Sequence, residues 1–299
     1  AQAHPSDAIL ADQAWAAWKN WDREGLAYGF QGFDGVDWDI EGVDDVASAD
    51  NVMSLKLLDM IGQFSQLAKA EGYITSLAPM QSYLDPTTSD FSRALTFEDP
   101  QYHHILPAPF KYHGHNCYAY LLAKYGSSSY DLIFVQLYES YSKAAYAIET
   151  RHKDAAAYLA HLLDLYSQGW LVNFDQDPTV GIHSQIVTVS PQQLVLGIAN
   201  AWGGRGDPVK ALYLDQAQLS QAWAGMTKLG LAPRGFGFWS LADEGKPERG
   251  DGPPVFLAQE LSKIVNPELP VGGEEEGRTP LHVVGLKQRA SVQSAAVSN

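Results

Sequence analysis

The stretch that most constrains the fold is GFDGVDWDIEG, residues 32–42, in which apolar and acidic residues alternate. Successive side chains of a β-strand point to opposite faces, so Asp37, Asp39 and Glu41 would share one face and the apolar residues between them the other. Like charges side by side repel, and burying a carboxylate is costly unless it is protonated or hydrogen-bonded. The stretch therefore predicts a strand whose acidic face requires a specific role.

Three explanations account for such a face. A solvated edge strand is the first, but the acidic face carries no Lys, Arg, Ser or Thr, which exposed strands usually mix in. A calcium site is the second, because the acids from Asp37 onward match the opening ligands of an EF-hand loop. That match fails at the loop's last ligand, where Ser48 stands in place of the bidentate Glu. The third is a set of coupled carboxyl groups tuned for proton transfer.

The coupled-acid explanation agrees with a known pattern. The spacing D-G-x-D-x-D-x-E, filled by Asp34, Gly35, Asp37, Asp39 and Glu41, resembles the signature of glycoside hydrolase family 18, the chitinases and their relatives. The resemblance implies a (β/α)8 TIM barrel of the α/β class, with the motif on the fourth strand and the active site at the carboxyl ends of the strands.

The rest of the chain shows the alternation of strands and helices that such a barrel requires. Apolar residues at three- and four-residue intervals predict helices at 6–26, where Ser6 is a plausible N-cap, and at 50–70, 153–168, 215–229 and 254–265. Nearly continuous apolar runs predict buried strands at 73–80, 130–138, 193–201 and 234–242. Together with the acidic strand, these runs account for strands four to eight of the barrel.

The resemblance also implies roles for residues at three later strand ends. Gln136 and Tyr138 stand where the family has a Met or Gln followed two residues later by a substrate-contacting Tyr. Trp239 stands where a Trp forms the floor of the sugar subsite at the scissile bond, and Met80 where an apolar contact to the same sugar is common. Relatives usually have Asn or Asp after the Tyr, whereas this chain has Glu139, which alters the far edge of that subsite. Taken singly, a Tyr or Trp in such a place is more often a core residue.

The implied mechanism explains the crowded acids. Glu41 would protonate the glycosidic oxygen, and the substrate's own 2-acetamido oxygen would be the nucleophile. Asp39 would orient the acetamido group, to which Tyr138 would donate a hydrogen bond. Asp37 would share a proton with Asp39, and this crowding would raise the pKa of the acid. Asp34, whose side chain would point to the opposite face from Asp37 and Asp39, would hold the start of the strand.

The composition of the chain limits the kinds of molecule that we expect it to bind. The formal net charge of −15 argues against nucleic acid or an anionic membrane surface, whereas a neutral polysaccharide is compatible. Cys117 is the single cysteine, which excludes an internal disulfide. The sequence contains no run of transmembrane length and no signal peptide, so secretion is an expectation from the resemblance alone. We expect a monomer without cofactor.

A group of histidines with one cysteine raises the question of a metal site. The stretch 102–120 contains His103, His104, His113, His115 and Cys117. Their spacing matches no structural zinc pattern, so we expect no metal and interpret the stretch as a surface loop bordering the cleft, between strands five and six.

The N-terminal part is shorter than a barrel requires. Only 33 residues precede Asp34, and they hold a helix but no convincing strand, so the first three βα units are not visible. We therefore expect a fragment of a longer gene product or a truncated paralogue, with open sheet edges that favour instability or self-association. Residues 1–265 would form the catalytic barrel, and the Pro-, Gly- and Glu-rich residues 266–299 a flexible tail.

The function predicted from these observations is retaining, endo-acting hydrolysis of β-1,4-linked N-acetylglucosamine polymers, chitin or chito-oligosaccharides. Between Trp202 and Arg234 there is no room for the small domain that deepens the cleft of processive relatives. Two alternatives remain: an endo-β-N-acetylglucosaminidase acting on N-glycans, and a non-catalytic chitinase-like lectin. Such lectins typically lose the counterpart of Glu41 or a neighbouring Asp, which this chain keeps, so the enzyme is favoured.

Overall fold

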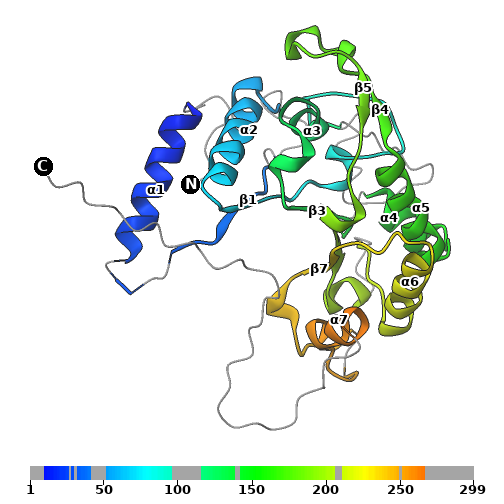
Figure 1. Ribbon diagram of the computed structural model, residues 1–299. Coiled ribbons are helices and arrows are strands. Elements are labelled where there is room, and N and C mark those ends of the chain that lie inside the picture. Colours follow the sequence, from blue (N-terminus) through cyan, green and yellow to red (C-terminus); the bar gives the residue numbers. More distant parts are fainter. Residues whose placement is uncertain are drawn as a thin grey trace, which may run out of the picture. The chain divides into compact units, whose positions relative to one another are not determined.

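A computed structural model describes residues 10–26, 28–29, 32–41, 52–95, 116–138, 142–205, 211–248 and 251–266. Its centre is a five-stranded sheet with the strand order β1-β2-β3-β6-β7, in which every neighbouring pair is parallel (Figure 1). The strands are β1 (Gly35–Trp38), β2 (Ile74–Leu77), β3 (Leu132–Gln136), β6 (Leu194–Ala199) and β7 (Gly235–Trp239). The sheet is thus assembled in chain order, as in a barrel.

Helices connect these strands. They are α1 (Ala11–Leu26), α2 (Leu55–Ala70), α3 (Ala119–Tyr125), α4 (Lys143–Ala145), which continues into a π-helical turn (Tyr146–Thr150), α5 (Ala155–Gln168), α6 (Gln216–Lys228) and α7 (Leu257–Val265). Side-chain caps fix several helix starts: Ser54 accepts from Leu57 N at α2, and Asp215 forms a capping box with Gln218 at α6. None of the described helices is long and apolar enough to cross a membrane.

The predicted elements are confirmed where the structure describes them. The five expected strands and five expected helices occur in the expected order, with ends that shift by a few residues. The result is a mixed α/β fold with a parallel sheet, compatible with a partial TIM barrel. Among the described residues no strand precedes β1, so closure into eight strands stays a prediction. The predicted tail, apart from Asn266, and the predicted N-cap Ser6 lie outside the described residues.

The helices α3 and α4 were not predicted, and neither was a hairpin of two strands. The antiparallel hairpin of β4 (Trp170–Val172) and β5 (Gln185–Val187) lies between α5 and β6, and its three-residue strands are too short to give a period. Its tip is tied to the segment that follows β2, because Asn173 N donates to Ser89 O at 2.8 Å and Arg93 Nε pairs with Asp177 Oδ2 at 2.8 Å.

The prediction of a surface loop at 102–120 is wrong for the end that the structure describes. Residues 116–120 are fully buried, and α3 begins at Ala119 and packs on α2. The Asn116 side chain accepts from Asp85 N and donates to Thr88 O and Asp90 O, which draws this end of the stretch into the core. The four histidines lie outside the described residues.

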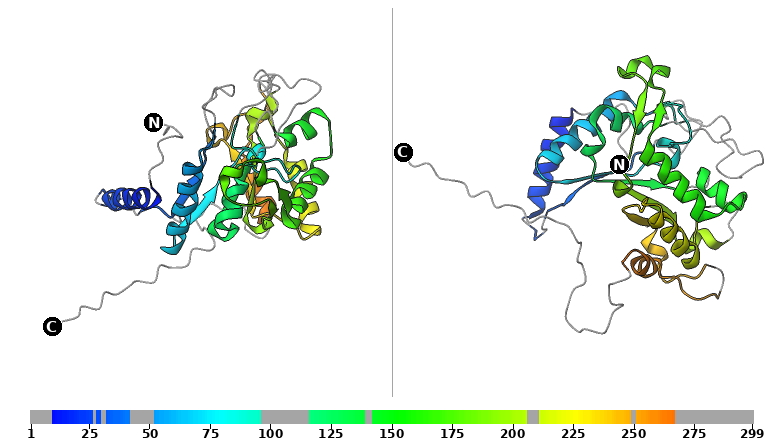
Figure 2. Two further views of the ribbon diagram at one scale, coloured as in Figure 1. Left: turned by 90° about the horizontal axis from the view of Figure 1, so that it is seen from above. Right: turned by 45° about the vertical axis from the view of Figure 1, so that its right-hand side comes forward.

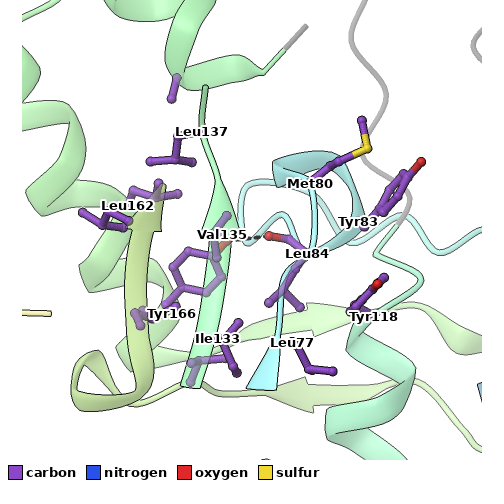
Figure 3. Close-up of a cluster of buried hydrophobic side chains, with 14 of the residues drawn as sticks. Leu77, Met80, Tyr83, Leu84, Tyr118, Ile133, Val135, Leu137, Leu162 and Tyr166 are labelled. Atoms are coloured by element: carbon purple, nitrogen blue, oxygen red, sulfur yellow. Dashed lines mark hydrogen bonds between the residues drawn. The ribbon is translucent and has the colours of Figure 1, made fainter. Parts of the chain in front are cut away.

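The main core lies between the sheet and its helices. On β3, Ile133 and Val135 point to this side and are fully buried, together with Leu77 of β2 and Leu162 of α5 (Figure 3). Strand parity then places the alternate residues of β3, among them Phe134, on the opposite face, which we call the inner face.

A second cluster fixes the face of β1. α1 packs against α2 beside the sheet (Figure 2), and Trp15 of α1 and Phe64 of α2 form a small core that includes Trp38. The Trp38 ring meets Phe64 edge-on at 5.1 Å between centroids, and its Nε1 donates to Ser65 Oγ at 2.9 Å. With Trp38 on the helix side, Asp37 must face inward.

Gly35 is required by the close approach of β2. A Cβ at Gly35 would lie 2.0 Å from the carbonyl oxygen of Ile74, so any side chain would force the two strands apart. We expect Gly35→Ala to lower the free energy of unfolding by about 1–3 kcal/mol, measured by urea denaturation, because such overpacking must shift backbone. Gly235→Ala on β7, where no atom lies within 4 Å of a Cβ, should change it by less than about 0.5 kcal/mol. Equal losses would contradict this explanation.

Candidate active site

A pocket of about 400 Å³ opens on the inner face of the sheet and reaches the carboxyl ends of its strands. It is lined by Asp37, Asp39, Ser76, Ala78, Leu132, Phe134, Gln136, Tyr138, Val195, Gly237 and Trp239. Residues predicted from three separate strand ends are therefore brought into one cavity. Sequence reasoning missed its apolar wall, because inward-facing residues of a buried parallel strand look like any other core residue.

Asp39 is held by an amide from β3. Gln136 Nε2 donates to Asp39 Oδ1 at 2.8 Å and to Ala78 O at 2.7 Å. Gln136 is only 1% exposed, so its amide is fixed by the surrounding strands. Its Oε1 is buried and has no hydrogen-bond partner among the described residues. Gln136, predicted to contact substrate, thus binds an acid of the motif.

The pKa of Asp39 is raised from its ordinary value to about 7. Partial burial is the main cause, although part of the side chain still faces solvent. The negative charge of Glu41 and a hydrogen bond with its carboxyl group raise it further, the Gln136 hydrogen bond lowers it, and the charge of Asp37 adds a small increase. The Asp39 carboxyl group therefore keeps its proton up to about pH 7, while it is hydrogen-bonded to Glu41.

Asp37 has a different partner. Its Oδ1 accepts a hydrogen bond from Ser76 Oγ, and the two residues are in register across β1 and β2. The sharing of a proton between Asp37 and Asp39 stays a prediction, since the hydrogen bonds described link Asp39 to Glu41 and Gln136. Ser76 was missed because strand register is not visible in the sequence.

Tyr138 and Trp239 form part of the pocket from the carboxyl ends of β3 and β7. Tyr138 follows β3 and is 8% exposed, packed with Ala199 and Ala211. Trp239 ends β7 with 60% of its surface exposed. Its carbonyl oxygen accepts from Asn200 N and from Trp202 Nε1, so the backbone under the exposed ring is fixed.

Other predicted residues do not line the pocket. Glu41 is exposed and is absent from the pocket lining, although its carboxyl group is hydrogen-bonded to Asp39. Met80 is buried in the main core and does not line the pocket, although its backbone forms a bridge with Gln136. Asp34 is exposed, and its carbonyl oxygen accepts from Ile74 N at 2.8 Å, at the start of the β1–β2 ladder. Glu139 lies outside the described residues. Within the described parts of the chain no group of three or more His, Cys, Asp or Glu side chains is placed to hold a metal ion.

The floor of the pocket depends on two glycines. A Cβ at Gly197 or Gly237 would lie 2.5 or 2.0 Å from the Phe134 ring, so the ring lies across both strands where side chains are missing. The resulting surface below the acids is apolar, whereas Asp37 and Asp39 themselves are exposed to solvent. The carboxyl groups at one end of the pocket can hold a proton, and the apolar wall at the other end can bind the apolar face of a ring.

The raised pKa of Asp39 makes stability depend on pH. Between its ordinary pKa of 3.8 and about 7 the folded chain retains a proton that the unfolded chain has lost, so the free energy of unfolding falls as pH rises through this window. Asp39→Asn removes that loss. We expect urea denaturation to show the variant gaining on the wild type from about pH 4 to pH 7 and no further above it. Parallel curves across the window would contradict the shift.

Among known proteins, the similarities found are to solved structures. No protein-family model matches the sequence, and curated proteins give no match. Among solved structures, a GH18 chitinase from Pseudoalteromonas aurantia is similar with a TM-score of 0.43 and 13% identity over 77% of this chain. A GH18 chitinase from the chitin utilization locus of Flavobacterium johnsoniae has a TM-score of 0.35 and 10% identity, also over 77% of this chain. The chain spans 67% of the first protein and 60% of the second.

Proposed function

We propose that the chain hydrolyses β-1,4-linked N-acetylglucosamine polymers, chitin or chito-oligosaccharides, with retention of anomeric configuration. The observation that carries the proposal is the Asp39 carboxyl group, hydrogen-bonded to both Glu41 and Gln136 in a pocket that also contains Tyr138 and Trp239. A general acid needs a proton near neutral pH, and the Asp39 carboxyl group, which keeps its proton up to about pH 7, can pass it to Glu41 through their hydrogen bond.

The chemistry follows from these positions. Glu41 gives its proton to the glycosidic oxygen as the bond from that oxygen to C1 breaks, and the substrate's acetamido oxygen bonds to C1. The proton that Glu41 transfers comes from Asp39 through their hydrogen bond, so Asp39 is ionised when it accepts the acetamido N–H and stabilises the positive charge of the oxazolinium that forms. Water, deprotonated by Glu41, then attacks C1 from the side of the departed group, the bond from C1 to the acetamido oxygen breaks, and the β-anomer with its acetamido group is restored. Tyr138 donates a hydrogen bond to the acetamido oxygen.

The aromatic and apolar walls serve binding. The exposed ring of Trp239 presents a flat apolar face, which suits the apolar face of a pyranose ring, and the pocket lies open on the inner face. An open site accepts a long polymer at an internal position, which supports endo-acting cleavage.

A chitin-binding lectin would use the same platform without chemistry. The raised pKa of Asp39 favours the enzyme, because a shifted carboxyl pKa serves proton transfer and contributes nothing to the stacking of a neutral sugar. Binding without turnover would leave the lectin as the function.

Glu41→Gln tests the enzyme directly. We expect it to lower the hydrolysis of chito-oligosaccharides by at least about a hundredfold, because the amide has no proton to give. Product anomers should be followed by NMR, and the wild type should release the β-anomer first. Glu24→Gln, which changes an exposed Glu of α1, is the matched control and should keep full activity. Release of the α-anomer, or an active Glu41→Gln, would refute the mechanism.

Trp239→Ala tests the sugar platform and applies to enzyme and lectin alike. We expect it to weaken the binding of an N-acetylglucosamine trimer by about fivefold or more in calorimetry, since an aromatic contact contributes about 1 kcal/mol beyond the area it buries. Trp21→Ala is a matched control, because Trp21 is 58% exposed on α1, against 60% for Trp239. If both variants bind as the wild type does, Trp239 is not a platform.

A further inference from the structure

The end of the acidic strand is held by side chains where the sheet ladder stops. The last β1–β2 backbone bond joins Ala78 N to Trp38 O at 2.9 Å. Beyond it, Ile40 N donates to the hydroxyl oxygen of Tyr118 at 2.9 Å, and the hydroxyl of Tyr83 donates to the carbonyl oxygen of Glu41 at 2.8 Å. Beyond the end of the ladder, two tyrosine hydroxyls therefore form the hydrogen bonds that a neighbouring strand would otherwise form with this backbone.

The Tyr118 hydroxyl both accepts and donates. Besides accepting from Ile40 N, its oxygen lies 3.1 Å from Ile40 O and 3.4 Å from Trp38 O, so its proton is directed at the backbone of the acidic strand. Tyr118 is fully buried, and burial raises the pKa of its phenol well above the ordinary value. The charges of Asp39 and Glu41 raise that pKa further, so the proton stays in place.

Both tyrosines belong to one rigid support. Tyr83 ends a 3-10 turn (Gln81–Tyr83) just after β2, and Tyr118 directly precedes α3. Their rings stack with centroids 6.2 Å apart and 15° between the planes, and Tyr118 N donates to Tyr83 O at 3.0 Å. Figure 3 shows both rings at the same end of the core cluster, near Met80. These contacts between the two tyrosines thus fix their hydroxyls relative to each other, independently of their hydrogen bonds to the acidic strand.

We infer that Tyr83 and Tyr118 are positioning residues for Glu41: their hydroxyls hold the backbone of residues 38–41, and thereby set where the Glu41 carboxyl group meets Asp39. Both hydroxyls are bonded to the backbone of the acidic strand, so the two tyrosines act through that strand. The inference rests on the proposed function, in which Glu41 transfers the proton. A displacement of about 1 Å at a reacting group can cost about a hundredfold in rate.

The first test is steady-state kinetics of Tyr83→Phe and Tyr118→Phe on a chito-oligosaccharide. We expect kcat to fall by about tenfold or more while KM changes by less than about twofold, because only proton transfer is misaligned. Tyr166→Phe is the matched control: Tyr166 is also fully buried, and its hydroxyl donates to Leu84 O in the same segment after β2 but does not contact the acidic strand. It should keep kcat.

The second test needs no turnover. In carboxyl-labelled protein, ¹³C NMR should show the pKa of Asp39, about 7 in the wild type, falling in both variants, because Glu41 and its charge move away. Tyr166→Phe should leave that titration unchanged. A wild type without turnover refutes the proposed function alone, and the titration then decides the positioning role.

Either readout can overturn the inference. It is overturned if Tyr83→Phe and Tyr118→Phe behave like the wild type, or if Tyr166→Phe changes kcat or the titration as much as they do, which would indicate general loosening of the core. Tyr118→Phe leaves Ile40 N without its acceptor; if this variant does not fold, Tyr83→Phe, which removes only a donor to a carbonyl, decides the outcome.

Discussion

The structure depends on which side chains of one four-residue strand, β1, point to the inner face of the sheet and which point to the helices. Trp38 is held on the helix side of the sheet by Phe64 and Ser65 of α2, and this fixes Asp37 on the inner face. A shift of one residue would bury the acids among apolar side chains and expose the indole, which the buried charge forbids. Gly35 completes the constraint, because only a residue without a side chain lets β2 approach at the start of the strand.

The order of the elements could be predicted from the sequence, because hydrophobic periods are displayed locally along the chain. The roles of Asp39, Gln136, Tyr138 and Trp239 were implied by the resemblance of their motifs to a known family, and the structure brings these four residues to one pocket, as expected where the carboxyl ends of parallel strands share one edge. What the sequence did not predict depends on register and on side-chain reach: Ser76 opposite Asp37 is one example.

Two further misses have the same cause. Met80 sits at a strand end as expected, but its side chain enters the core, and no local period distinguishes the two directions at a residue that follows a strand. The position of 102–120 in a long connection between two strands predicts a surface loop, whereas Asn116 draws the end of this stretch inward by bonds to 85–90. Polar residues that satisfy buried backbone groups are not visible as such in a sequence.

The partners of the acidic strand lie far along the chain. Glu41 is joined to a tyrosine 42 residues later, Ile40 to one 78 residues later, and Asp39 to a glutamine 97 residues later. Contacts of such long range form only after much of the chain has been ordered, since the entropy of closing each loop must be met first. A partly folded chain would therefore carry all of the acids and none of their arrangement, so the raised pKa of Asp39 is also a marker of completed folding.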